Sequence, residues 1–147
     1  MARKASHHAA QTIARECLAL RIRRLDRSLS RIYDGALRPH GVTIAQMGLL
    51  TAVTLSEPIQ PSKLGDILDL ERSTVSRNVA LLLRKGWVSA SLAADGRSQL
   101  LAITRRGEDL LKELLPAWRR AQRRAEELLT PERVLAFLEI SRTFDNR

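Results

Sequence analysis

The feature that most constrains the fold of this chain is an apolar stripe with helical spacing near each end of the sequence. Apolar residues recur in alternating steps of four and three from Leu18 to Ala36, and again over 107–128. This spacing places them along one face of an α-helix, a face that another element must cover. The sequence therefore predicts a long helix over 13–37 and another from residue 106, which Pro116 kinks or shortens at its start.

The composition supports a mainly helical protein. Of 147 residues 44% are hydrophobic, which is too apolar for a disordered chain, and seven Gly with five Pro are too few for a many-stranded sheet protein. The one cysteine, Cys17, has no partner for an internal disulfide, which fits a reducing compartment. Without a readable signal peptide or membrane span, we expect a cytoplasmic protein.

Local signals predict the elements between the two stripes. Thr43 with Gln46 forms a capping-box pattern, Gly86 suits a helix end, and Asp95-Gly96 is a hairpin turn signal between two short runs free of charge. Thr130-Pro131-Glu132 is typical of a helix start. The expected helices cover 44–55, 61–68, 72–85 and 131–143, and the expected strands cover 87–92 and 99–104.

The order of these elements suggests two helical end segments around a compact centre. We divide the chain into an N-terminal dimerisation helix (1–40), a central module (41–106) and C-terminal dimerisation helices (107–147). A chain of this size has little else to cover such long stripes, so we expect a homodimer. The predicted dimerisation residues are Leu18, Ile22, Leu111, Leu114, Trp118, Leu135, Phe137 and Leu138.

Positive charge is concentrated in two stretches, residues 1–31 and residues 72–106, each with a net charge of +6. Residues 72–106 carry seven basic residues and one acid, Asp95. Such a field favours a polyanion as partner, although basic residues also simply keep a chain soluble. The charge therefore indicates nucleic acid only together with a suitable motif.

The helix expected over 72–85 has the residue distribution of a DNA-recognition helix. It starts with Arg72, short hydroxyl side chains, Arg77 and Asn78, and becomes apolar only later. Short polar and Arg side chains near a helix N-terminus can reach base edges and phosphates in the major groove. The hairpin that follows presents Arg97 at a tip narrow enough for an adjacent minor groove. Asp95 is placed to hold Arg97 by a charge-assisted hydrogen bond.

Four segments together resemble the MarR family of winged helix-turn-helix regulators. They are LGDILDLERSTVSR at 64–77, LLRKGWV at 82–88, DGR at 95–97 and ITRRG at 103–107. The resemblance implies a mainly α fold with a small β-hairpin wing, a winged helix-turn-helix flanked by dimerisation helices. It also implies a homodimer that binds palindromic double-stranded DNA. In that complex, Ser62 and Lys63 would contact the phosphates of the DNA backbone. The full set of predicted DNA contacts is Ser62, Lys63, Arg72, Ser73, Thr74, Ser76, Arg77, Asn78, Arg84, Asp95 and Arg97.

The resemblance further implies a repressor that a small aromatic acid or phenol releases from DNA. We expect such an effector near Cys17, Arg21, Met47, Thr51 and Trp118, with Arg21 as the carboxylate partner. Each residue also has a simpler interpretation, which is core packing for Met47 and Trp118 and solvation for Arg21. Some relatives sense peroxide through a cysteine in the first helix, which makes Cys17 the basis of an alternative, a redox-sensing repressor.

Other classes of function find little support. The sequence has no phosphate-binding glycine loop, zinc-protease motif, nucleophile elbow or acid pair, so we predict neither an enzyme nor a cofactor. His7, His8 and His40 lack metal-site spacing, and we expect the first two in a mobile tail. A winged-helix scaffold that does not bind DNA remains the second alternative, and steep salt dependence of DNA binding would separate the two.

Overall fold

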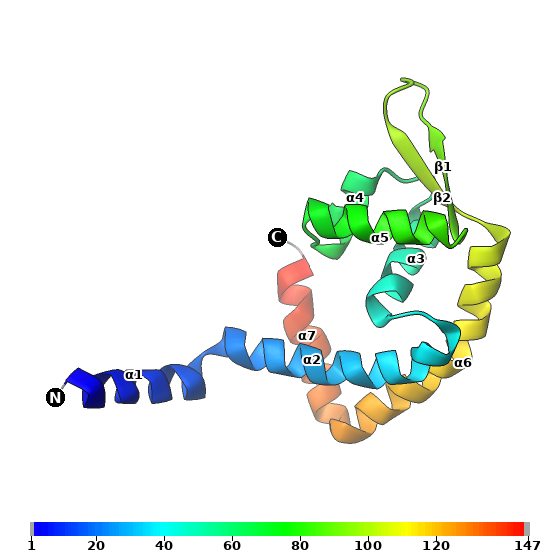
Figure 1. Ribbon diagram of the computed structural model, residues 1–147. Helices are drawn as coiled ribbons and strands as arrows, with labels where there is room; N and C mark the ends of the chain where they lie inside the picture. The colour runs from blue at the N-terminus through cyan, green and yellow to red at the C-terminus, as the bar shows by residue number, and fades with distance from the viewer. Residues whose placement is uncertain (1, 146–147) are drawn as a thin grey trace.

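The computed structural model describes residues 2–145 and confirms the mainly helical fold with a hairpin. Figure 1 shows α3, α4, α5 and the hairpin gathered on one side, with α2, α7 and the second half of α6 on the other. The predicted end segments also include residues 1, 146 and 147, which lie outside the described residues. The elements are α1 (Ala2–Glu16), α2 (Leu18–Leu37), the short 3-10 helix η1 (Arg38–His40), α3 (Ile44–Ser56), α4 (Pro61–Leu68), α5 (Arg72–Arg84), β1 (Val88–Leu92), β2 (Gln99–Ile103), α6 (Arg105–Leu128) and α7 (Pro131–Asp145).

The N-terminal part differs from the prediction in two ways. The single helix expected over 13–37 is interrupted at Cys17, whose backbone is extended (φ −69°, ψ 111°). The expected tail with His7 and His8 is instead part of helix α1. Arg21 explains how the break is tolerated, because its guanidinium donates hydrogen bonds to the Arg15 carbonyl at the end of α1.

The local signals of the central module are confirmed. Both halves of the capping box are present, since Thr43 Oγ1 accepts from the Gln46 N–H and Gln46 Oε1 accepts from the Thr43 N–H. Gly86 adopts φ +69° after α5, and its N–H donates to the Leu83 carbonyl. The three helices of this module, α3, α4 and α5, start where they were expected, and their ends lie within one residue of the predicted ones.

The two-stranded hairpin is joined at its base by an isolated β-bridge. β1 and β2 pair antiparallel with Val88 opposite Ile103, each one residue shorter than predicted. Ile59, in the segment between α3 and α4, exchanges two backbone hydrogen bonds with Leu101 of β2. This pairing anchors the base of the wing to the helical part of the module.

The core lies between α3, α4, α5, the hairpin base and the first half of α6. Its largest fully buried side chains are Leu37, Leu49, Leu50, Val53, Leu64, Leu82, Leu101 and Leu114. This placement corrects one prediction, because Leu114 was expected to face a second copy and is covered by its own chain instead. Leu111, also predicted at the dimer interface, is half-buried and packs against the same core.

Helix α6 connects the two sides of the molecule and carries Pro116 inside it. Figure 1 shows α6 changing direction near its middle, which agrees with the kinked alternative of the prediction. Over residues 2–145, none of the helices combines the length and the apolar character that crossing a membrane requires.

Candidate nucleic-acid interface

The turn between α4 and α5 fixes the angle of the helix-turn-helix. Asp69 ends α4 in the left-handed region (φ 49°), which Asp tolerates better than most residues. The N–H groups of Asp69 and Leu70 both donate to the Gly65 carbonyl. A Cβ on Gly65 would lie 3.1 Å from the Leu70 carbonyl oxygen, so a small residue suits this position.

Helix α5 separates an apolar inner face from a polar outer face. Val75, Val79 and Leu82 are buried against the core. The predicted contacts Thr74 and Asn78 are half-buried, and the Asn78 amide donates to the Thr74 carbonyl (2.9 Å), which occupies one of its donors. The exposed polar residues of α5 are Arg72, Ser73, Ser76, Arg77 and, at the opposite end of the helix, Arg84.

The first turn of α4 presents the two residues expected to contact the DNA backbone. Ser62 and Lys63 are exposed, and Pro61 occupies the first helical position. The Lys63 ammonium forms an ion pair with Asp66 one turn later (3.2 Å). Both groups are largely solvated, so the pair is worth little and leaves Lys63 available to a phosphate.

The wing tip is organised around one carboxylate. Asp95 Oδ1 accepts from the backbone N–H groups of Arg97 and Ser98, both at 2.9 Å, and Oδ2 accepts from the Ser98 hydroxyl at 2.7 Å. The predicted bond between Asp95 and Arg97 is therefore present, but to the backbone. The Arg97 guanidinium is exposed and has no protein partner among residues 2–145. Sequence reasoning missed Ser98, although Asp followed three residues later by Ser is a known turn pattern.

These hydrogen bonds lower the pKa of Asp95, chiefly through the Ser98 backbone N–H and then that of Arg97. A carboxyl group whose folded pKa is lowered contributes stability above its unfolded pKa near 4 and loses it as the pH falls through the folded value. We therefore expect Asp95 to order the wing equally at pH 6 and pH 8. The Asp95→Ala variant should bind duplex DNA more weakly, by a smaller factor than loss of Arg97, with the same deficit at both pH values in a fluorescence anisotropy titration. A deficit that grows from pH 6 to pH 8 would contradict this.

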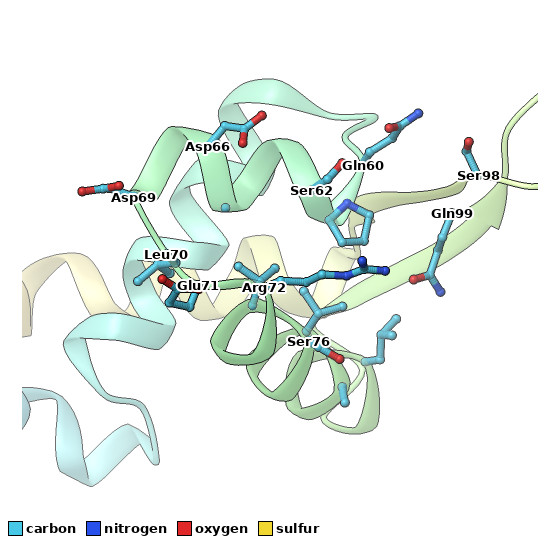
Figure 2. A pocket seen from close by; sticks show the side chains of 16 residues that line it. Gln60, Ser62, Asp66, Asp69, Leu70, Glu71, Arg72, Ser76, Ser98 and Gln99 are labelled. Carbon is cyan, nitrogen blue, oxygen red and sulfur yellow. The ribbon is translucent and has the colours of Figure 1, made fainter. Parts of the chain in front are cut away.

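A groove of about 900 Å³ runs between α4, α5 and the start of β2. Figure 2 shows Arg72 extending across it toward Gln99, whereas Asp66 and Asp69 point away on the far side. The structure thus brings together Ser62, Arg72 and Ser76 from the predicted set on one surface. Arg84 lies outside this groove, and Gln99 was not predicted because a lone Gln in a strand carries no signal.

The residues predicted to hold an effector do not gather around a described cavity. Cys17 lies at the junction of α1 and α2, and the Arg21 guanidinium is engaged with a backbone carbonyl. Met47 packs against the core, and Thr51 donates to its carbonyl. Neither the groove described above nor the shallow hollow on α2 over 26–34 includes any of the five, Trp118 among them.

Comparison with known proteins shows which family this chain resembles. Residues 40–98 match the sequence model of the MarR family. A curated relative, the uncharacterized HTH-type transcriptional regulator YwoH of Bacillus subtilis, is 25% identical over 88 residues, which are 60% of this chain and 64% of that protein. The matched stretch therefore spans less than two thirds of this relative.

Solved structures extend the likeness over most of the chain. A mutant MarR from E. coli complexed with operator DNA gives a TM-score of 0.81 at 19% identity, covering 90% of this chain and 96% of that one. The M. tuberculosis regulator MosR in complex with DNA gives a TM-score of 0.76 at 29% identity, covering 89% and 98%. At 19% identity the first comparison establishes the fold alone.

Proposed function

We propose that this chain, which belongs to the MarR family, works as a homodimer that binds palindromic double-stranded DNA. The family consists of transcriptional regulators and not of enzymes. The observation that supports the proposal is that α5 and the wing carry exposed arginines, Arg72, Arg77 and Arg97, none of which forms an ion pair with an acid among residues 2–145. In this role α5 enters the major groove and the wing reaches the next minor groove.

The exposed apolar residues of the end helices support a dimer. Leu18 and Ile22 on α2 are 74% and 61% exposed, and no side chain over 132–144 of α7 is buried. The apolar residues of α7, among them Leu135, Phe137 and Leu138, are not confined to one face of the helix. Apolar area of this extent in water is a common mark of a protein-protein interface. The predicted contacts that are exposed and available to a second copy are Leu18, Ile22, Leu135, Phe137 and Leu138, whereas Leu111 and Trp118 are half-buried.

A single charge on α7 should break this dimer. Leu135 is 67% exposed in one chain, so Leu135→Glu costs the protomer little but leaves an unpaired carboxylate in the interface. We expect the dimer dissociation constant to rise at least about tenfold in sedimentation equilibrium, which corresponds to about 1.4 kcal/mol. Ser28→Glu adds the same charge to a polar face of α2 and is the matched control. If both variants stay as dimeric as the wild type, α7 is not part of the interface.

Selection from a random duplex pool tests the DNA-binding proposal. The wild-type dimer should retain sequences with two inverted half-sites about one duplex turn apart. Its affinity for the selected duplex should fall with salt by about 0.9 logarithmic units per neutralised phosphate for each logarithmic unit of salt. Weak binding with no enriched sequence would favour a winged-helix interaction scaffold instead.

In regulation, we propose that the protein is a repressor that a small aromatic acid or phenol releases. No described cavity supports this part, which rests on the family assignment alone. A thermal-shift and DNA-release screen with such compounds tests it, and complete lack of effect would leave a repressor without this class of effector. Cys17 supports the redox alternative only through its half-buried place at a helix junction. Loss of peroxide-induced DNA release in Cys17→Ser would favour that alternative.

A further inference from the structure

Helix α3 is the element that links the end helices to the DNA-contacting surface. It packs against α2 and α6 and also against α4, α5 and β2. Each of its ends is also joined to another element by a hydrogen bond between a backbone N–H and a carboxylate, to α2 at the N-terminal end and to β2 at the C-terminal end. The orientation of α3 on α2 therefore determines how the lobe formed by α3, α4, α5 and the hairpin is presented.

The bond at the N-terminal end of α3 comes from α2. Asp34 Oδ1 accepts from the Ile44 N–H at 2.7 Å, a donor that the capping box of Thr43 and Gln46 leaves free. A carboxylate at a helix N-terminus is favoured by the helix dipole, and the hydrogen bond is charge-assisted. Asp34 is half-buried, so water screens this contact less than a surface ion pair.

Tyr33, the residue before Asp34, connects α2 to α6. The Tyr33 hydroxyl donates to Gln122 Oε1 of α6 at 2.5 Å, and the Gln122 amide donates to Glu126 at 2.8 Å. Tyr33 therefore connects α2 to α6, and the next residue, Asp34, connects α2 to α3.

The far end of α3 is fixed to the wing. Glu57 Oε2, directly after α3, accepts from the N–H of Ile103, the last residue of β2, at 2.6 Å. A change in the direction of α3 would consequently move the base of the hairpin as well as the helix-turn-helix.

We propose that Asp34 is a positioning residue that sets the direction of the DNA-binding lobe on α2, and with it the half-site spacing that the dimer accepts. The inference rests on the proposed function, because spacing has meaning only for a dimer that binds two half-sites. Asp34 lies on α2, outside the surface that faces DNA, so its loss removes no phosphate contact.

The test compares the duplex selected by the wild-type protein with versions that carry one or two additional base pairs between the half-sites. For Asp34→Ala we expect about tenfold weaker binding to the selected duplex, the scale of one lost charged hydrogen bond. We also expect a much smaller difference between the selected and lengthened duplexes, and an unchanged salt slope. A destabilised but correctly oriented lobe would keep the wild-type preference for spacing.

Two variants serve as controls. Asp34→Asn retains an acceptor oxygen and should restore most of the wild-type spacing preference, whereas Asp26→Ala removes the same charge from α2 without a bond to α3. Wild-type affinity and spacing preference in Asp34→Ala would overturn the proposal. If circular dichroism shows that Asp34→Ala does not fold, Asp34→Glu takes its place, because this variant keeps the charge but displaces the carboxylate. An unchanged spacing preference in Asp34→Glu would then overturn the proposal. Failure of the wild-type protein to select any duplex would instead refute the proposed function.

Discussion

Arg97→Ala is expected to weaken binding to the selected duplex by about 1–3 kcal/mol, or roughly 5- to 150-fold at constant salt. The reason is geometric, because Asp95 holds the backbone of Arg97 and leaves its guanidinium exposed at the narrow end of the hairpin. An A·T-rich minor groove has a negative potential that favours such a group. Fluorescence anisotropy at several salt concentrations measures the loss.

The control for this variant removes an equivalent charge elsewhere. Arg119 is an exposed arginine on the second half of α6, away from the hairpin, and Arg119→Ala should bind almost as well as the wild type. Arg97→Lys should recover part of the loss, because it restores the charge without the planar guanidinium. If Arg97→Ala and Arg119→Ala bind alike, the wing does not contact DNA and the effect is one of net charge.

Much of this fold could be predicted because its signals are local. Thr43 and Gln46 form their capping box within one turn, and Gly86 with φ +69° ends α5 by a backbone requirement that the residue itself reveals. Asp95-Gly96 likewise encodes its own turn. Each of these patterns works through neighbouring atoms, so no knowledge of the rest of the chain is needed.

The break at Cys17 could not be predicted, because its stabilisation does not come from neighbouring residues. No Gly or Pro marks it, and the hydrogen bonds from Arg21 that complete the end of α1 come from six residues away. Helical periodicity also cannot tell a face that packs within the chain from one left for a partner. Leu18 and Leu114 both follow the spacing, yet Leu18 is 74% exposed and Leu114 is fully buried.

The candidate site was predictable in its residue types and not in its connections. Most of the polar residues predicted at the start of α5, and the Arg at the hairpin tip, are exposed, whereas Thr74 and Asn78 are half-buried. The bonds of Asp34 and Glu57 join segments 10 and 46 residues apart. A lone carboxylate in a sequence gives no sign of which distant N–H it accepts from.

Gly107→Ala is expected to destabilise the protein by about 3 kcal/mol, although Ala is normally the better helix residue. A Cβ at Gly107 would lie 2.1 Å from the Trp87 carbonyl oxygen and 2.9 Å from two side-chain carbons of Ile103. The nearest of these atoms belongs to the backbone. The Thr104 hydroxyl donates to the carbonyls of both Gly86 and Trp87, so the backbone at Trp87 cannot move away from Gly107 without losing these hydrogen bonds. Urea denaturation and thermal melting at one protein concentration should show the loss, with a melting temperature about 6–12 °C lower.

A second glycine in a helix isolates the packing effect. Gly35 lies on the exposed side of α2, and a Cβ there would meet nothing within 4 Å. Gly35→Ala should therefore stabilise the chain by about 0.5–1 kcal/mol through helix propensity alone. Opposite signs for the two substitutions would show that contact between the start of α6 and the entry to β1 governs Gly107. A Gly107→Ala protein as stable as Gly35→Ala would mean that the base of the hairpin does not pack against the start of α6 as closely as the distances from Gly107 indicate.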